Sequence, residues 1–185
     1  EKPQKLFQVD HHMGIAAAGY IPDARGQVND IRFFSQSSKL VYDEPVDVET
    51  VAKHTADQFQ HYTQYAGVRP MGVALIIGGV DNNGNSLFLA DPSGTYVAYN
   101  AVAIGANSDI VTEFLKKEYK SGLTIDEGSM LAIAAIYLSS EIKKGIKHIK
   151  ISQIRNDTKR FEIITDEQLT KLAQSAVEKY PVEHK

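Results

Sequence analysis

The sequence of 185 residues predicts an α+β fold in which antiparallel sheets are covered by layers of helices. Segments with a strand pattern come in groups, and segments with the helical period come in pairs. A parallel nucleotide-binding sheet would instead alternate strand and helix. Hydrophobic residues make up 43% of the chain and charged residues 23%, which is ordinary for a globular protein of this size. With no internal repeat or linker, residues 1–185 are expected to form a single domain.

The first third of the chain predicts two strands followed by two helices. Residues 6–9 and 12–18 are expected to pair, since the small residues of the second run permit close sheet packing. Residues 23–40 form the first helix, and Asp47 is a suitable N-cap for the second. Each helix carries one buried stripe: Ala24, Val28, Ile31 and Ser35 in the first, and Val48, Val51, Ala52, Thr55, Phe59 and Tyr62 in the second.

Three strands joined by tight turns are expected next. Residues 72–80 are a buried apolar run, and residues 86–90 and 96–104 are the other two strands. Asn83-Gly84 is expected to supply positive φ where the chain first reverses. The segment 91–94 reads Asp-Pro-Ser-Gly, which predicts the second turn.

The last third predicts two helices, a hairpin and a final helix: residues 108–119, 125–144, 149–154 with 161–164, and 165–180. The hairpin is expected to turn at Asn156-Asp157. Capping boxes are predicted at Thr124 with Glu127 and at Thr165 with Gln168, because each pair can satisfy two free amides at a helix start.

Composition narrows the classes of function. A net charge of −3 argues against a nucleic-acid or anionic-membrane partner, and no apolar run reaches the roughly 18 residues that a membrane span needs. Without cysteine the chain has no disulfide, thiol nucleophile or cysteine-based metal site. These observations favour a cytoplasmic protein.

Motifs that could carry chemistry are few. Asp10-His11-His12 could in principle supply metal ligands, but neighbouring strand residues point to opposite faces, and a turn at a strand end is the simpler interpretation. The glycine-rich run 14–19 lacks the Lys-Ser/Thr of a phosphate loop, and no Gly-x-Ser-x-Gly elbow occurs. A catalytic serine triad assembled from residues distant in the sequence is kept as an alternative. We expect no metal site and no cofactor.

Residues 60–74 read Gln-His-Tyr-Thr-Gln-Tyr-Ala-Gly-Val-Arg-Pro-Met-Gly-Val-Ala. Gly67 can end a helix in a left-handed conformation, and Pro70 cannot continue one, so the segment predicts a helix-to-strand turn. Its sequence closely resembles that of the corresponding turn in proteasome alpha-type subunits, particularly archaeal ones. Further matches to that family extend along the chain: residues 6–10, 14–19, 23–25, 87–94, 101–105 and 114–119.

The resemblance implies a four-layer αββα sandwich, the N-terminal nucleophile hydrolase fold. It implies a non-catalytic structural subunit in the outer heptameric ring of the 20S proteasome, which acts in ATP-dependent protein degradation. The implied partners are other alpha subunits in a seven-membered ring, catalytic beta-type subunits, the C-termini of regulatory ATPases or other activators, and unfolded polypeptide substrate.

Two sites are carried over residue by residue. The loop Tyr65, Ala66, Gly67 and Val68 matches the family's pore-constriction loop, with Ala66 in place of the usual glycine. Lys5 matches a lysine that binds activator C-terminal carboxylates, and Gly19 and Tyr20 would line the same docking pocket. Lys2 competes for the lysine assignment, and Lys5 as a plain exposed strand-edge lysine is the alternative.

The chain departs from the family pattern at its start. The segment with the gating Tyr-Asp-Arg, the first helix and the first two strands is expected to be missing, so the fold would be N-terminally truncated. The alternative function is a catalytic beta-type subunit or another N-terminal nucleophile hydrolase, which uses an N-terminal Thr, Ser or Cys. Glu1 cannot act in that way, so no catalytic residue is expected. A third alternative is an unrelated small-molecule enzyme or binding domain.

Overall fold

The computed structural model describes residues 4–138 and 148–181 and confirms the α+β class. The chain forms two compact units. Unit 1 comprises Glu1–Asn100 with Ile154–Phe161, and unit 2 comprises Ala101–Gln153 with Glu162–Lys185. That residues 1–185 behave as a single domain stays a prediction.

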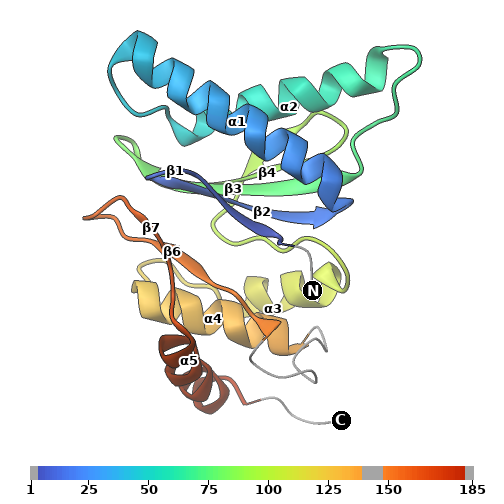
Figure 1. The fold of residues 1–185 in the computed structure, drawn as a ribbon. Helices are drawn as coiled ribbons and strands as arrows, with labels where there is room; N and C mark the ends of the chain where they lie inside the picture. The colour runs from blue at the N-terminus through green and yellow to red at the C-terminus, as the bar shows by residue number, and fades with distance from the viewer. Residues whose placement is uncertain (1–3, 139–147, 182–185) are drawn as a thin grey trace. The chain divides into compact units, whose positions relative to one another are not determined.

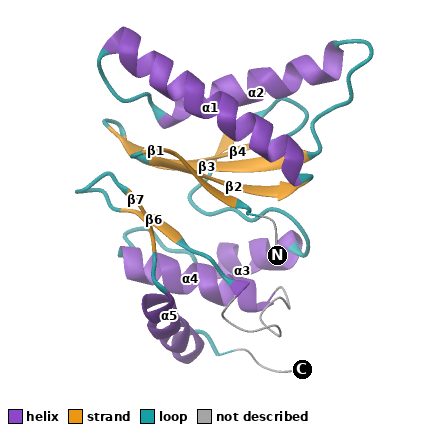
Figure 2. Ribbon diagram, in the orientation of Figure 1, coloured by secondary structure: helices purple, strands orange, loops and turns teal. Residues whose placement is uncertain are grey.

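Unit 1 is built on a five-stranded antiparallel sheet in the order β1-β2-β3-β4-β5. Its strands are β1 (Leu6–Asp10), β2 (Met13–Gly19), β3 (Val73–Asp81), β4 (Gly84–Ala90) and β5 (Tyr96–Ala98). Helices α1 (Ile21–Tyr42) and α2 (Val48–Gln64) lie side by side on one face of this sheet (Figures 1 and 2).

The core of unit 1 lies between this helix pair and the central strands. Alternate residues of β2 and β3 are fully buried, with Ile15 opposite Ile77 in the register. The predicted helical stripes are buried as well, apart from Tyr62, which is half-buried near the end of α2. Burial of each large aliphatic side chain contributes about 1.5–3 kcal/mol, so this interface holds the two layers together.

Two details of the sheet differ from the sequence prediction. Asn83 does not adopt positive φ; Gly84 alone does so at this turn (φ 106°), and Asp81 Oδ1 accepts a 2.8 Å hydrogen bond from Asn83 N.

The strand expected at 96–104 is also much shorter. β5 pairs with the last three residues of β4, and residues 101–104 are irregular and belong to unit 2. β4 continues beyond this pairing to Gly84, and Tyr99 N still donates to the Leu87 carbonyl oxygen at 2.9 Å, so the chain leaves the sheet before the partners on β4 are used up.

Asp47 is the N-cap residue of α2, as predicted, and precedes the helix in an extended conformation, but its side chain does not make the capping hydrogen bond. The amide of Val48 instead donates to Asp81 Oδ2, at 2.9 Å, from the end of β3. The start of α2 is therefore capped by tertiary structure.

Unit 2 contains three helices, α3 (Ser108–Glu118), α4 (Ile125–Leu138) and α5 (Asp166–Lys179). It also contains most of a short two-stranded sheet of β6 (Ser152–Ile154) and β7 (Phe161–Ile163), whose residues 154 and 161 are counted with unit 1. Both predicted capping boxes are present, with Glu127 N 3.2 Å from Thr124 Oγ1 and Gln168 N 3.3 Å from Thr165 Oγ1. The expected helix 125–144 extends to Leu138, and its last six positions lie outside the described residues. In the described part of the chain, no helix is both long and apolar enough to cross a membrane.

Candidate functional site

The residues that the family resemblance singled out lie at one end of the unit 1 sheet. Antiparallel pairing sets the start of β1 beside the end of β2, and Gly19 lies opposite Val73 at the start of β3. Helix α1 begins directly after β2, and residues 65–72 run from the end of α2 to β3 (Figure 1). We call this region, made of Lys5, residues 19–23 and residues 65–72, the loop end.

Lys5 lies on the surface immediately before β1. Its carbonyl oxygen accepts a 2.9 Å hydrogen bond from Ala17 N, so the backbone of Lys5 is held beside the final residues of β2. Lys5 therefore lies at the same sheet end as Gly19 and Tyr20.

Gly19 and Tyr20 form the connection between β2 and α1. Gly19 has φ of 117°, and a Cβ on it would overlap the carbonyl oxygen of Gly72. Glycine is required here for both reasons. Tyr20 N donates to that same carbonyl oxygen at 2.8 Å, while the Tyr20 side chain remains 54% exposed. An aromatic surface is thus presented to solvent on a rigid backbone.

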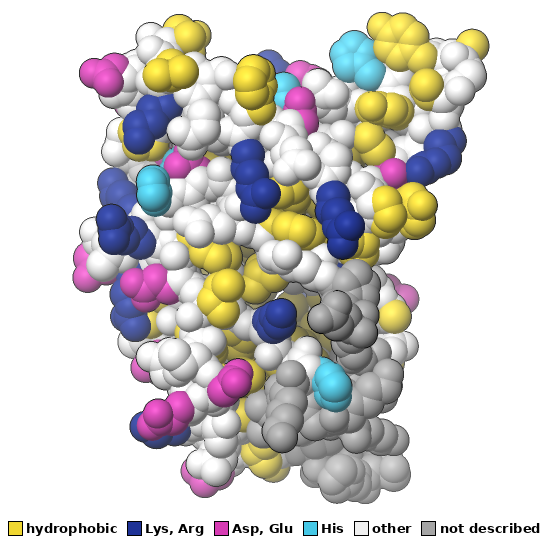
Figure 3. Space-filling model, viewed as in Figure 1, with side chains coloured by type: hydrophobic (Ala, Val, Ile, Leu, Met, Phe, Trp, Pro, Cys, Tyr) yellow, Lys and Arg dark blue, Asp and Glu magenta, His cyan; other side chains and the backbone are white. Residues whose placement is uncertain are grey.

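The loop Tyr65–Val68 stands out from the end of α2. Tyr65 N still bonds the His61 carbonyl at 3.3 Å, and the two rings stack with centroids 5.7 Å apart. Gly67 has the predicted positive φ, 84°, but it does not end the helix, because α2 ends at Gln64 and Tyr65 is already extended. A Cβ added to Gly67 would meet no atom within 4 Å. All four loop residues are exposed, and hydrophobic side chains with a histidine beside them appear at the upper right of Figure 3.

An ion pair that sequence reasoning missed joins these parts. Arg69 donates through both terminal nitrogens to Asp23, with Nη1–Oδ2 of 2.7 Å and Nη2–Oδ1 of 2.8 Å. Gly72 N donates to Asp23 Oδ2 at 2.9 Å, and the Arg69 guanidinium carbon lies 5.3 Å from the centre of the Tyr20 ring. No local signal could have found the pair, because 46 residues separate its members.

This arrangement stabilises the charged form of Asp23. The hydrogen bond from Arg69 is the main cause of a lowered pKa for the Asp23 carboxyl, and the Gly72 amide and the Arg69 charge act in the same direction. Partial burial opposes them without reversing the shift. The same pairing raises the pKa of Arg69. The pair is therefore fully ionised at neutral pH.

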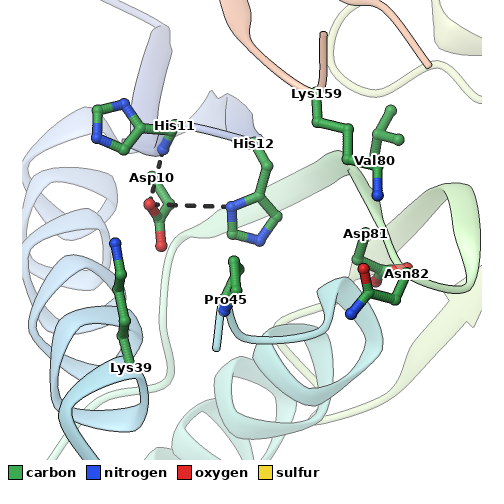
Figure 4. A pocket seen from close by; sticks show the side chains of 9 residues that line it. All are labelled: Asp10, His11, His12, Lys39, Pro45, Val80, Asp81, Asn82 and Lys159. Atoms are coloured by element: carbon green, nitrogen blue, oxygen red, sulfur yellow. Dashed lines mark hydrogen bonds and ion pairs between the residues drawn. The ribbon is translucent and has the colours of Figure 1, made fainter. Parts of the chain in front are cut away.

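The opposite end of the same sheet is a polar and largely buried cluster, which we call the turn end: residues 10–13, 45–48 and 80–83. His12 Nε2 lies 2.8 Å from the Val46 carbonyl oxygen and therefore donates to it. Asp10 Oδ1 accepts from His11 N at 2.7 Å, and Asp10 Oδ2 is buried without a hydrogen-bond partner. A cavity of about 140 Å³ opens here, and Figure 4 labels its lining: Asp10, His11, His12, Lys39, Pro45, Val80, Asp81, Asn82 and Lys159.

The Asp10-His11-His12 motif accordingly ends β1 and begins a turn, where the Asp10 and His12 side chains bind backbone groups. The rings of His11 and His12 point in different directions in Figure 4. Across the described residues, 4–138 and 148–181, no three side chains of the metal-binding types converge. The cavity is also at the end of the sheet remote from Lys5, Tyr20 and the loop.

Taken together, unit 1 and its loop end define an α+β protein that presents an exposed glycine-containing loop, an exposed lysine and an exposed tyrosine at one end of its sheet. Comparison with known proteins identifies the class. The family model described as "Proteasome subunit" matches residues 1–154. The chain belongs to the proteasome subunit family.

Several relatives within that family are archaeal alpha subunits. The chain is 38% identical over 180 residues to "Proteasome subunit alpha" of Methanosarcina barkeri, covering 97% of this chain and 72% of the relative. It is 38% identical over 176 residues to the protein of that name in Archaeoglobus fulgidus, covering 95% and 71%. It is 40% identical over 165 residues to "Proteasome subunit alpha 1" of Haloarcula marismortui, covering 89% and 64%. The resemblance inferred from residues 60–74 is confirmed.

Proposed function

We propose that this chain is a non-catalytic structural subunit of the outer heptameric ring of the 20S proteasome. In this role it forms part of the substrate entry pore and part of the docking surface for regulatory ATPases. The observation that carries the proposal is the match to alpha-type subunits over 97% of the chain. The four-layer αββα sandwich and a cytoplasmic location belong to the same proposal.

The pore function is assigned to Tyr65, Ala66, Gly67 and Val68. A ring of several copies needs a short projecting turn with little side-chain bulk at the centre. The loop has these properties: Ala66 and Gly67 are small, and Gly67 adopts the left-handed conformation that lets the chain turn sharply. Seven copies around an axis would form a constriction that an extended polypeptide could thread.

Activator docking is assigned to Lys5, Gly19 and Tyr20. A C-terminal carboxylate is a strong partner for an exposed ammonium group, because a hydrogen bond between ions is about twice as strong as a neutral one. Lys5 is exposed, and Tyr20 offers a half-exposed ring at the same sheet end. The backbone of Gly19 packs closely against that of Gly72, which keeps the connection from β2 to Tyr20 rigid.

The partners proposed are alpha subunits in the same ring, catalytic beta-type subunits below it, activator C-termini above it, and unfolded polypeptide. No cofactor takes part. The catalytic alternative, a beta-type or other N-terminal nucleophile hydrolase subunit, has no structural observation in its favour.

Native mass spectrometry of the purified chain tests the proposal, first alone and then with an archaeal beta-type subunit. We expect species of seven or fourteen copies, and peptide hydrolysis that requires the beta subunit. Monomers under both conditions would contradict the ring assignment. Inhibitor-sensitive peptidase activity that co-purifies with this chain alone would favour the catalytic alternative.

A further inference from the structure

One carboxylate holds both the base of the projecting loop and the start of α1. Asp23 accepts two hydrogen bonds from Arg69 and one from Gly72 N, all between 2.7 and 2.9 Å. We propose that the Asp23–Arg69 pair positions the loop Tyr65–Val68 and ties it to Tyr20, so that the proposed pore loop and the proposed docking pocket move as one element.

The segment between the two anchored residues has little freedom of its own. Arg69 and Gly72 are bound to the same carboxylate, and the proline ring restricts φ at position 70. Gly72 is held a second time, through its carbonyl oxygen, by Tyr20 N. Residues 69–72 therefore form a rigid base from which the loop projects.

The loop itself has few contacts that could position it. Beside Gly67 there is open space, and Tyr65 and Val68 are 63% and 45% exposed. Apart from the stacking of the Tyr65 ring on His61, the direction of such an exposed segment is set by its two ends. One end is the last turn of α2, through Tyr65 N and the His61 carbonyl oxygen, and the other is Arg69.

Tyr20 connects this base to the proposed docking pocket. The Arg69 guanidinium lies against the Tyr20 ring, at 5.3 Å from its centre, a cation–π distance. A ligand that covers the exposed Tyr20 ring therefore also meets Arg69. Asp23 and Arg69 are positioning residues here, because they act through the loop and the tyrosine.

We call the Asp23–Arg69 pair, together with the loop base that it fixes, the clamp. The clamp is inferred from the hydrogen bonds alone, whereas the role of the loop in a pore rests on the proposed function. A spin label reports on the clamp without any assumption about the pore. The chain has no cysteine, so Ala66→Cys provides a single attachment site at the loop tip. The electron paramagnetic resonance spectrum of the label measures loop motion on the nanosecond scale in any oligomeric state.

Arg69→Lys is the main test variant, because lysine keeps the positive charge and lacks the two-pronged geometry. We expect it to shorten the rotational correlation time of the label by about twofold, with Asp23→Asn producing a similar change. The reversed pair, Asp23→Arg with Arg69→Asp, should restore part of the ordering. Glu167→Gln is the matched control, since it removes one carboxylate from the Lys171 ion pair on α5 and should leave the label unchanged.

Circular dichroism on each variant establishes that it is folded, and Arg69→Lys is mild enough to keep the test valid if Asp23→Asn unfolds. A label spectrum unchanged by Arg69→Lys in the folded protein would overturn the clamp. Passage of an unfolded protein through assembled particles is measured separately. Unchanged passage in a variant with a loosened loop would count against the pore assignment and leave the clamp in place.

Discussion

The two ends of the unit 1 sheet differ in whether the polar side chains that hold their connecting segments are buried or exposed. At the turn end, polar side chains are buried: Asp10, His12 and Asp81 are 8%, 5% and 7% exposed. Asp10 binds the amide of the next residue, whereas His12 and Asp81 bind backbone groups more than 30 residues away. At the loop end, Tyr20 and Tyr65 are 54% and 63% exposed, and the Arg69 side chain that holds the segment is itself on the surface.

We interpret the buried polar residues of the turn end as structural and the exposed ones of the loop end as functional. A buried hydrogen-bonded carboxylate stabilises a fold, since leaving its partner unsatisfied costs about 1–3 kcal/mol. An exposed ion pair contributes less, about 0–1 kcal/mol, but keeps its neighbours accessible to a ligand. We therefore expect the turn end to dominate stability and the loop end to dominate interactions.

Asp81→Ala should have the largest effect on stability. It removes the acceptor of Val48 N at the start of α2 and of Asn83 N in the turn, and it leaves the Val48 amide buried without a partner. We expect the free energy of unfolding in urea to fall by about 3 kcal/mol. Asp91→Ala is the control: Asp91 makes the similar turn bond to Ser93 N at an exposed position and should cost much less. Equal losses would refute the contrast between the ends.

Glycine substitutions compare two positions within the loop end. Gly19→Ala should destabilise the protein by about 2–3 kcal/mol, because positive φ strain is added to a clash with the Gly72 carbonyl oxygen. Gly67→Ala has open space and should cost about 1 kcal/mol, the strain of the left-handed conformation alone. Thermal unfolding of both variants measures the difference, and a Gly67→Ala loss as large as that of Gly19→Ala would show that the loop is packed.

The Asp23–Arg69 pair predicts a pH dependence of modest size. Because the folded-state pKa of Asp23 is lowered, the stabilisation is present above the unfolded pKa of about 3.9 and is lost as pH falls through the folded value. We expect Asp23→Asn to cost about 1 kcal/mol at pH 7. The gap between wild type and variant, measured by urea unfolding, should be constant from about pH 5 to 8 and shrink below about pH 4. A gap that persists at low pH would mean that the charge is not responsible.

Lys5→Ala should have the smallest effect on stability, within about 0.5 kcal/mol, because the side chain is exposed. In assembled particles the same change should abolish stimulation by an activator with its native C-terminal carboxylate. Lys53→Ala, on the exposed face of α2, is the matched control for loss of one positive charge. Stimulation that survives Lys5→Ala would move the docking assignment to another lysine.

Local rules accounted for much of the fold. The element order, the capping boxes at Thr124 and Thr165, and the positive φ of Gly67 follow from residues within one turn of each other. The exposed loop and Lys5 were also found from the sequence, through the family resemblance of residues 60–74 and of the first strand. Their roles in a pore and a docking pocket remain proposals.

By itself the sequence determined the α+β class, the places where helices begin and chains reverse, and the proteasome family. The tertiary structure alone decided that Asp81 rather than Asp47 caps α2, that β5 stops at Ala98, and that Arg69 binds Asp23. Caps and turns depend on neighbours in the chain, which a sequence displays. These three outcomes depend on strand register and helix placement, which bring together groups up to 46 residues apart, and no local pattern encodes such a distance.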